Sequence, residues 1–190
     1  MVHKFDVKRA AILEDEERIR LINPSHVFRA SGIGKGAGVA DVGCGTGVFS
    51  ILLSRVVEEG GVIYAVDVEK EMLTIVEEKM RKEGLVNIKP ILSTESHIPR
   101  PMGSVDHVLL VDTLHELEGQ LTLKEIHRIL RLDGTFTVVE WKKIPTSMGP
   151  PLSERIASQE AVEMLEKLDF KPRITADAGP EHYLIIATKV

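Results

Sequence analysis

At 190 residues with 43% hydrophobic side chains, the chain has the size and composition of one soluble globular domain. Its net charge of −5, from 24 basic and 29 acidic residues, excludes a global attraction to nucleic acid, and its single cysteine, Cys44, excludes an intrachain disulfide or a cysteine metal cluster. Because no apolar run approaches the roughly 20 residues that span a bilayer and the N-terminus has no apolar signal core, we expect a complete cytoplasmic protein with no DNA and no membrane as partner.

Short apolar runs alternate with longer amphipathic segments along most of the chain. This alternation is typical of βαβ units and predicts an α/β fold in which helices cover both faces of a parallel sheet. In chain order, we expect helices at 7–22 and 24–30, a strand at 39–43, a helix at 48–58, a strand at 62–66, a helix at 70–82, strands at 88–92 and 105–113, a helix at 121–130, a strand at 135–141, a helix within 153–170 and a strand at 181–189.

The connections between these elements give further expectations. Residues 1–38 precede the first strand, so we expect a helical cap segment there and one sheet domain at 39–190. The sequence RLDG at 131–134 is expected to stop a helix and form a turn. The segment 144–154 carries three prolines, which cannot continue a central strand, so it is predicted to be a surface loop: Pro145, Pro150 and Pro151.

The stretch VADVGCGTGVF, residues 39–49, places three glycines between the first expected strand and its helix. Such a turn lets backbone N–H groups and the helix N-terminus approach a ligand. The dinucleotide pattern G-x-G-x-x-G needs a third glycine where Val48 stands, and no Lys-Ser or Lys-Thr pair follows the glycines as in a P-loop. NAD and a P-loop nucleotide are therefore disfavoured.

Two acidic residues near this loop narrow the ligand further. Asp67 ends the second expected strand, 20 residues after Gly47, where an acid would accept hydrogen bonds from ribose hydroxyls. Asp41 stands two residues before Gly43, and a carboxylate there would repel a phosphate but favour an ammonium group. S-adenosylmethionine has both a ribose and a cationic end, so it is the expected ligand.

The sequence resembles the class I S-adenosylmethionine-dependent methyltransferases from about residue 39 to the C-terminus. The resemblance rests on VADVGCGTG, YAVDVEKEML, SVDHVLLVDTLHEL and LRLDGTFTVVE, four motifs in the family's order and spacing. It is most similar to the compact group that includes the ubiquinone and menaquinone biosynthesis methyltransferases. This resemblance implies a three-layer Rossmann-like sheet of about seven strands, mostly parallel with an antiparallel last strand, and S-adenosylhomocysteine as the product.

The resemblance also implies roles for single residues. It places Asp41 and the loop around the methionine part of the cofactor, Asp67 at the ribose, and Val68 or Met72 against the adenine. Relatives usually have an Asp that contacts the adenine amino group; here Thr94 stands at that place, with Glu95 next to it. The full set of expected cofactor-binding residues is Asp41, Gly43, Cys44, Gly45, Gly47, Asp67, Val68, Met72, Thr94, Glu95 and Asp112.

Catalytic candidates follow the fourth and fifth expected strands. Asp112 is expected either to touch the cofactor amine or the acceptor, or to be a hydrogen-bonded strand-end residue. His115 suits a general base at neutral pH, and Glu140 and Trp141 end the fifth strand near the expected acceptor pocket. Lys142 and Lys143 either attract an anionic acceptor or form a solvated strand end. The other candidate histidines are expected on the surface or in structural positions, and we expect no metal site: His26, His97, His107, His127 and His182.

The methyl acceptor is narrowed mainly by absent motifs. No Asn/Asp-Pro-Pro-aromatic motif follows the fourth strand, which disfavours methylation of amino groups on DNA bases and of protein glutamine, and the single cysteine argues against arsenite methylation. With net negative charge, a small-molecule acceptor is favoured. The alternatives are a protein or RNA methyltransferase and a cofactor-binding module without catalysis.

Overall fold

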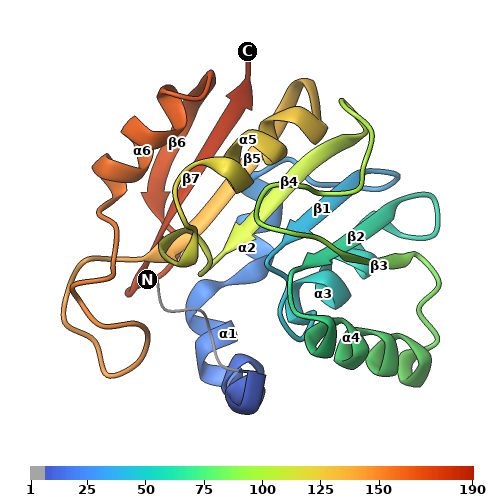
Figure 1. Cartoon of the computed structure of the whole chain (residues 1–190). Helices are drawn as coiled ribbons and strands as arrows, with labels where there is room; N and C mark the ends of the chain where they lie inside the picture. Colours follow the sequence, from blue (N-terminus) through green and yellow to red (C-terminus); the bar gives the residue numbers. More distant parts are fainter. Residues whose placement is uncertain (1–6) are drawn as a thin grey trace.

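The computed structural model describes residues 7–190, which form a seven-stranded sheet in the order β3-β2-β1-β4-β5-β7-β6 (Figure 1). The neighbouring strands from β3 to β5 pair in parallel, whereas β7 is antiparallel to both β5 and β6. The strands are β1 (Gly38–Val42), β2 (Val62–Asp67), β3 (Ile88–Leu92), β4 (Val105–Val111), β5 (Leu130–Trp141), β6 (Phe170–Asp177) and β7 (His182–Lys189). The expected mostly parallel sheet with an antiparallel last strand is confirmed.

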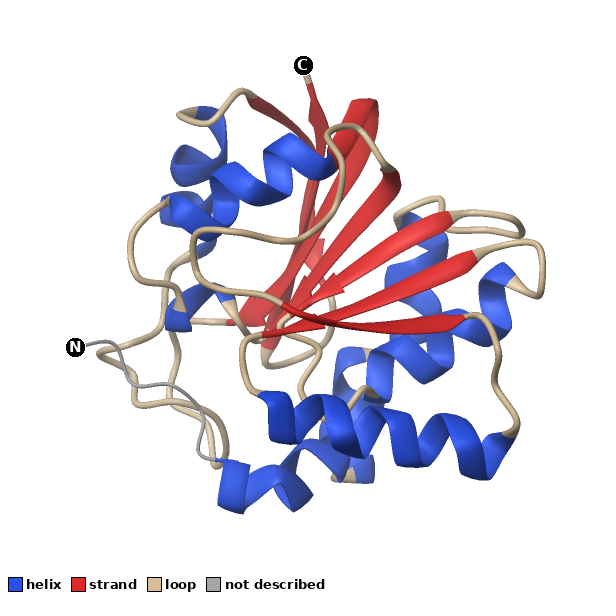
Figure 2. Cartoon of the chain, turned by 45° about the vertical axis from the view of Figure 1, so that its right-hand side comes forward, coloured by secondary structure: helices blue, strands red, loops and turns tan. Residues whose placement is uncertain are grey.

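Helices lie on both sides of this sheet (Figure 2). Strand residues alternate between the two faces, so Val39 of β1 belongs to one hydrophobic core and its neighbour Ala40 belongs to the other. The α-helices are α1 (Glu16–Ile22), α2 (Pro24–Ala30), α3 (Val48–Val57), α4 (Lys70–Glu83), α5 (Leu121–Ile129) and α6 (Ser158–Glu166), and the 3₁₀ helices are η1 (Val7–Glu14) and η2 (Leu114–Glu116). Helices α2, α3 and α4 bury side chains in the first core, α5 and α6 in the second.

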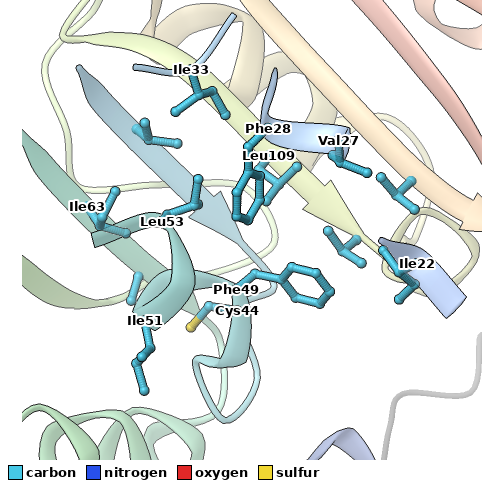
Figure 3. Close-up of a cluster of buried hydrophobic side chains, with 14 of the residues drawn as sticks. Ile22, Val27, Phe28, Ile33, Cys44, Phe49, Ile51, Leu53, Ile63 and Leu109 are labelled. Atoms are coloured by element: carbon cyan, nitrogen blue, oxygen red, sulfur yellow. The ribbon is translucent and has the colours of Figure 1, made fainter. Parts of the chain in front are cut away.

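The N-terminal helix α2 is part of the first core. Val27 and Phe28 of α2 lie among side chains of the sheet and of α3, including Leu53 and Leu109 (Figure 3). The hydroxyl of Thr137 on β5 also donates to Ser31 Oγ at 2.8 Å, which ties the end of α2 to the sheet. The boundary between a cap segment and the sheet domain at residue 38 stays a prediction, and residues 1–6 of that segment lie outside the described residues.

Three elements differ from the sequence expectation, each for a local reason. The expected helix 7–22 is divided at Asp15, whose carboxylate accepts from the Arg18 N–H at 2.8 Å and so starts a new helix. RLDG lies inside β5 as an irregularity, with Asp133 at φ 59°, rather than as a turn before it. Strand β6 was not among the expected elements, because it is an edge strand with Pro172 and little buried surface.

In the described part of the chain, every helix is too short or too polar to cross a bilayer.

Candidate active site

A cavity of about 680 Å³ lies at the carboxyl ends of β1, β2, β4 and β5. In this strand order the chain continues from β1 and β4 toward opposite edges of the sheet, and such a switch point leaves a crevice for ligands. His115 lines the cavity, whereas Glu140 lies behind His115 and Gly47 lies outside the lining. The other expected cofactor-binding residues all line it: Asp41, Gly43, Cys44, Gly45, Asp67, Val68, Met72, Thr94, Glu95 and Asp112.

The loop between β1 and α3 needs its glycines for shape and for close packing. Gly43, Gly45 and Gly47 have φ angles of 68°, 52° and 78°, a region that side chains disfavour. A Cβ at Gly43 would lie 2.5 Å from Thr113, and one at Gly47 would lie 2.7 Å from Val76 of α4. Gly47 therefore allows the turn into α3, while Gly43 and Gly45 bring the backbone to the cavity wall.

Asp67 is held in a fixed orientation at the end of β2. Its Oδ2 accepts a hydrogen bond from the Gly45 N–H at 2.8 Å, and its Oδ1 accepts one from the Glu69 N–H at 2.9 Å. Burial raises the pKa of this carboxyl group above its ordinary value, although these hydrogen bonds oppose the shift. The glycine loop and the β2 acid, 22 residues apart in sequence, thus form one rigid wall of the cavity.

Asp41 is the most deeply buried acid of the cavity wall, with only 2% of the residue exposed. Ser50 of α3 donates its hydroxyl to Asp41 Oδ2 at 2.6 Å. Burial nevertheless raises the pKa of Asp41 to about 7, and the negative charge of Asp67 adds to the rise. Of the ion pairs identified within residues 7–190, none involves Asp41 or Asp67.

These two acids allow a test of the expected cofactor. A buried carboxylate is stabilised when a cation approaches it, and a cationic ligand in the cavity would supply that charge. A carboxylate oxygen can accept two hydrogen bonds. Each oxygen of Asp67 accepts one of the backbone hydrogen bonds named above, so lone pairs remain for the hydroxyl groups of a ligand. The residues present therefore fit S-adenosylmethionine, which carries both a cationic end and a ribose.

The N-terminal segment closes one side of the cavity. Arg18 of α1 forms an ion pair with Asp112, Nη2 to Oδ2 at 2.7 Å, and also donates from Nη1 to the Leu13 carbonyl at 3.1 Å. Glu14 of η1 contacts both Thr46 of the glycine loop and Lys79 of α4. Arg18 could not be predicted from the sequence, because nothing in its local sequence distinguishes it from a solvated arginine of an amphipathic helix.

Asp112 is held between Arg18 of α1 and His182 of β7. It follows β4 with φ 50°, and His182 Nε2 of β7 lies 3.2 Å from its Oδ1. Burial by itself would raise the pKa of Asp112, but the positive charges of Arg18 and His182 hold it below the ordinary value. Asp112 is thus both a bonded strand-end residue and part of the cavity wall, and His182 is buried in a structural position.

His115 and Glu140, which are 25 residues apart, form the second hydrogen-bonded pair of the site. His115 Nδ1 lies 2.9 Å from Glu140 Oε2, and the His115 N–H donates to the same oxygen at 3.2 Å. The other oxygen of the fully buried Glu140 accepts from the Trp141 N–H at 2.7 Å. Burial tends to lower the pKa of His115, but the hydrogen bond and charge of Glu140, with the charges of Glu116 and Asp112, raise it above 6.5.

Loop 144–154 is fastened over Trp141 by one residue, Arg155. Its guanidinium donates to oxygens of five residues between 142 and 150 at 2.6–3.1 Å and lies 5.1 Å from the Trp141 ring centre. Trp141 is buried and also lines the cavity. Lys142 instead bonds to Asp177 at 2.9 Å, and neither Lys142 nor Lys143 lines the cavity.

Replacing Arg155 with alanine is expected to loosen this loop and lower the free energy of unfolding by about 1–3 kcal/mol, because several partly buried oxygens lose their donor. Limited proteolysis should show faster cleavage within 144–154, and urea unfolding should show the loss of stability. Arg173→Ala, at an exposed position of β6, is the matched control and should leave both unchanged. Equal cleavage of Arg155→Ala and wild type would mean that Arg155 does not hold the loop.

Comparison with known proteins agrees with this geometry. A family model described as "Methyltransferase domain" matches residues 40–138. The chain is 33% identical over 124 residues to the demethylmenaquinone methyltransferase of Geobacillus stearothermophilus. This match covers 65% of this chain and 53% of the relative. It is also 33% identical over 115 residues to the ubiquinone/menaquinone biosynthesis C-methyltransferase UbiE of Haemophilus ducreyi, covering 60% of this chain and 44% of the relative. The chain thus spans about half the length of the curated relatives it matches.

A solved structure matches over nearly the whole chain. The crystal structure of a SAM-dependent methyltransferase from Aquifex aeolicus superposes with a TM-score of 0.95 at 33% identity, covering 98% of this chain and 100% of that structure. The match includes the seven-stranded sheet and therefore the switch point at which the cavity lies. Since both the family model and this structure match, the chain belongs to the class I S-adenosylmethionine-dependent methyltransferases.

Proposed function

We propose that this protein transfers a methyl group from S-adenosylmethionine to a small molecule bound in the same cavity. The observation that supports this most directly is the division of the cavity lining. Asp41 and Asp67 form an acidic part in which no ion pair is identified among residues 7–190. Leu117, Trp141 and Met148 provide apolar surface in the part that includes His115. A cavity of about 680 Å³ is within the range of small-molecule pockets, which favours a small acceptor over a macromolecule.

The chemistry follows from positioning. S-adenosylmethionine, when bound, supplies an electrophilic methyl group on a positively charged sulfur. The protein's part is to hold donor and acceptor in line, which can contribute about 7–11 kcal/mol in favourable cases. In this proposal Asp41 holds the cationic amino-acid end, Asp67 the ribose, and Val68, Met72, Thr94 and Glu95 the adenine. Residues 1–38 act as the cap that separates the reaction from water, through η1 and α1 in the described part.

The acceptor class comes from the relatives' names. Demethylmenaquinone methyltransferase and UbiE carry quinone biosynthesis in their names. We propose that a reduced, quinol-like aromatic compound is the first acceptor to test, with other phenols, amines and thiols beside it. Transfer of a labelled methyl group to such a panel and to protein and RNA fractions tests the function. Label found only in protein or RNA would overturn the small-molecule acceptor, and binding of the cofactor without any transfer would favour a binding module.

Asp67→Ala is expected to weaken binding of S-adenosylhomocysteine by about 1–3 kcal/mol, because a buried hydrogen-bond acceptor for the ribose is lost. Isothermal titration calorimetry at pH 7.5 measures this directly. Glu83→Ala, on α4 in an exposed ion pair with Arg55, is the matched loss of an acid and should leave the affinity unchanged. Unchanged affinity in Asp67→Ala would remove Asp67 from the ribose site.

A further inference from the structure

We propose that His115 is the general base of the reaction and that its Nε2 takes a proton from the acceptor. Glu140 is the positioning residue that holds His115. The inference rests on the proposed methyl transfer and adds the class of acceptor: a molecule whose methylated atom loses a proton, such as a phenolic oxygen or the ring carbon of a hydroquinone. Glu140 would never touch the acceptor, since it is fully buried and does not line the cavity.

The hydrogen bonds fix which nitrogen of His115 carries the proton. Glu140 Oε2 lies 2.9 Å from Nδ1 and already accepts the backbone N–H of His115 at 3.2 Å. Because both oxygens of Glu140 already accept backbone N–H groups, Nδ1 is the donor to Oε2 in the neutral ring and Nε2 keeps its lone pair. A base whose second ring nitrogen is held by a buried carboxylate is a recurring arrangement in proton-transfer sites.

Within residues 7–190, no hydrogen bond is identified at Nε2 of His115, so this nitrogen is available to a molecule in the cavity. His115 lines the cavity, and its Nε2 lies 3.7 Å from Glu116 Oε1, beyond hydrogen-bonding distance. The other charged groups that face His115 are acids from three elements: Glu140 of β5, Glu116 of η2 and Asp112 at the end of β4. Their combined charge raises the pKa of His115, and this favours a base of useful strength near neutral pH.

Other acids of the cavity are poorer bases for this step. Asp112 is paired with Arg18 at 2.7 Å, and its pKa lies below the ordinary value, so it holds a proton weakly. Asp41, with a pKa of about 7, would be basic enough, but it lies beside Ser50 in the acidic part of the wall, which the proposed function assigns to the cationic end of the cofactor. His115 alone combines a cavity position, a fixed tautomer and a raised pKa within the described residues.

The step balances as follows. With a phenolic oxygen, the O–H proton passes to His115 Nε2 and the oxygen's electron pair forms the new bond to the methyl carbon. With a ring carbon, a π pair of the ring forms that bond, and the C–H proton passes to His115 Nε2 while the C–H pair returns to the ring. In both cases the pair of the broken carbon–sulfur bond stays on sulfur. One proton is released to solvent for each methyl group transferred. Acceptors that lose no proton on methylation, such as thioethers and pyridines, need no base and should not depend on His115.

The first experiment uses transfer of a labelled methyl group from S-adenosylmethionine to hydroquinones and phenols, and in parallel to thioethers and pyridines. His115→Gln is expected to lower kcat for the first group by about 100-fold or more, with S-adenosylhomocysteine affinity within about threefold of wild type. Glu140→Gln should lower kcat less and move the acid limb of the kcat/KM profile to lower pH, because the carboxylate that raises the pKa of His115 is gone. His97→Gln, an exposed histidine far from β5 in sequence, is the matched control.

Nitrogen NMR of His115 in the full-length wild type is the second measurement and needs no acceptor. The neutral ring should carry its proton on Nδ1, and the pKa of His115 should fall in Glu140→Gln. Three results would overturn the roles of His115 and Glu140 while leaving the proposed function standing. They are the opposite tautomer of His115, turnover of phenols by His115→Gln at the wild-type rate, and a wild type that methylates only thioethers or pyridines. If the wild type binds S-adenosylhomocysteine but methylates neither the hydroquinones and phenols nor the thioethers and pyridines, the proposed function is overturned. The roles of His115 and Glu140 are then overturned with it.

Discussion

Replacing Arg18 with methionine is expected to lower the free energy of unfolding by about 3–5 kcal/mol, because it leaves a buried carboxylate without its nearest cation. The Arg18 and Asp112 side chains are only 9% and 7% exposed, so water from the cavity replaces the lost partner only in part. The ion pair also joins residues 94 apart in sequence and fastens α1 beside the end of β4. Urea unfolding at pH 7, followed by circular dichroism, measures the change.

The pH dependence of this effect has a defined sign. Because the pKa of Asp112 is lower in the folded chain than the ordinary value of about 3.9, its stabilisation is complete above that ordinary value. It is lost as the pH falls through the lower folded pKa. The difference in stability between wild type and Arg18→Met should therefore be constant around neutral pH and shrink in acid.

Two further variants test whether the loss of stability in Arg18→Met comes from the ion pair with Asp112. Arg20→Met, on the same helix but with a side chain that is 74% exposed and paired with Glu17, should change stability by no more than about 0.5 kcal/mol. Arg18→Met combined with Asp112→Asn removes both charges, and the double variant should recover part of the loss. A loss below about 1 kcal/mol in Arg18→Met would show that α1 is not held against Asp112 in solution.

Most of the fold could be predicted from the pattern of apolar residues and the positions of the glycines. Strands β1, β2 and β4 are buried on both faces and form near-continuous apolar runs, which is the pattern of a parallel sheet. Strand β6 carried no such signal because only Phe170 is fully buried, and its position comes from pairing with β7. The break at Asp15 was missed because a capping aspartate and a solvated helical aspartate have the same local sequence appearance.

The site residues could be predicted from the sequence where they stand at the ends of strands. Asp41 and Asp67 stand at the carboxyl ends of β1 and β2, so their meeting at one edge followed from the parallel arrangement. Arg18 and Arg155 were missed because their partners are selected by the tertiary fold: Asp112 for Arg18, and the oxygens of a proline-rich loop for Arg155. Likewise the position of Glu140 behind His115 depends on how η2 turns after β4.

Asp41→Asn is expected to stabilise the ligand-free protein at pH 8 relative to wild type. The folded pKa of Asp41, about 7, lies above the ordinary value of about 3.9, so the folded chain binds this proton more tightly than the unfolded chain. Its contribution to stability is complete below about pH 4 and is lost as the pH rises through 7, by about 4 kcal/mol in total. The variant has no such loss, so its advantage should grow between pH 5 and pH 8 in urea unfolding.

The same substitution is expected to weaken ligand binding. A ligand with an ammonium group favours the ionised form of Asp41, so wild-type affinity for S-adenosylhomocysteine should rise by up to about tenfold per pH unit below pH 7 and level off above it. Calorimetry in buffers of different ionisation enthalpy should detect the proton released on binding. Asp41→Asn should bind more weakly at pH 8 and show neither effect, whereas Glu71→Gln, at an exposed position of α4, should behave as wild type.

Stability and affinity thus change in opposite directions at Asp41, and this opposition separates a ligand-binding role from a structural one. A carboxylate that served only packing beside Ser50 would gain stability on replacement by the neutral amide without any loss of affinity. A carboxylate that holds a cationic ligand destabilises the empty cavity and is compensated only on binding. Affinity that stays constant between pH 5.5 and pH 8 in wild type, or equal affinity in Asp41→Asn, would therefore remove Asp41 from the cofactor's cationic end.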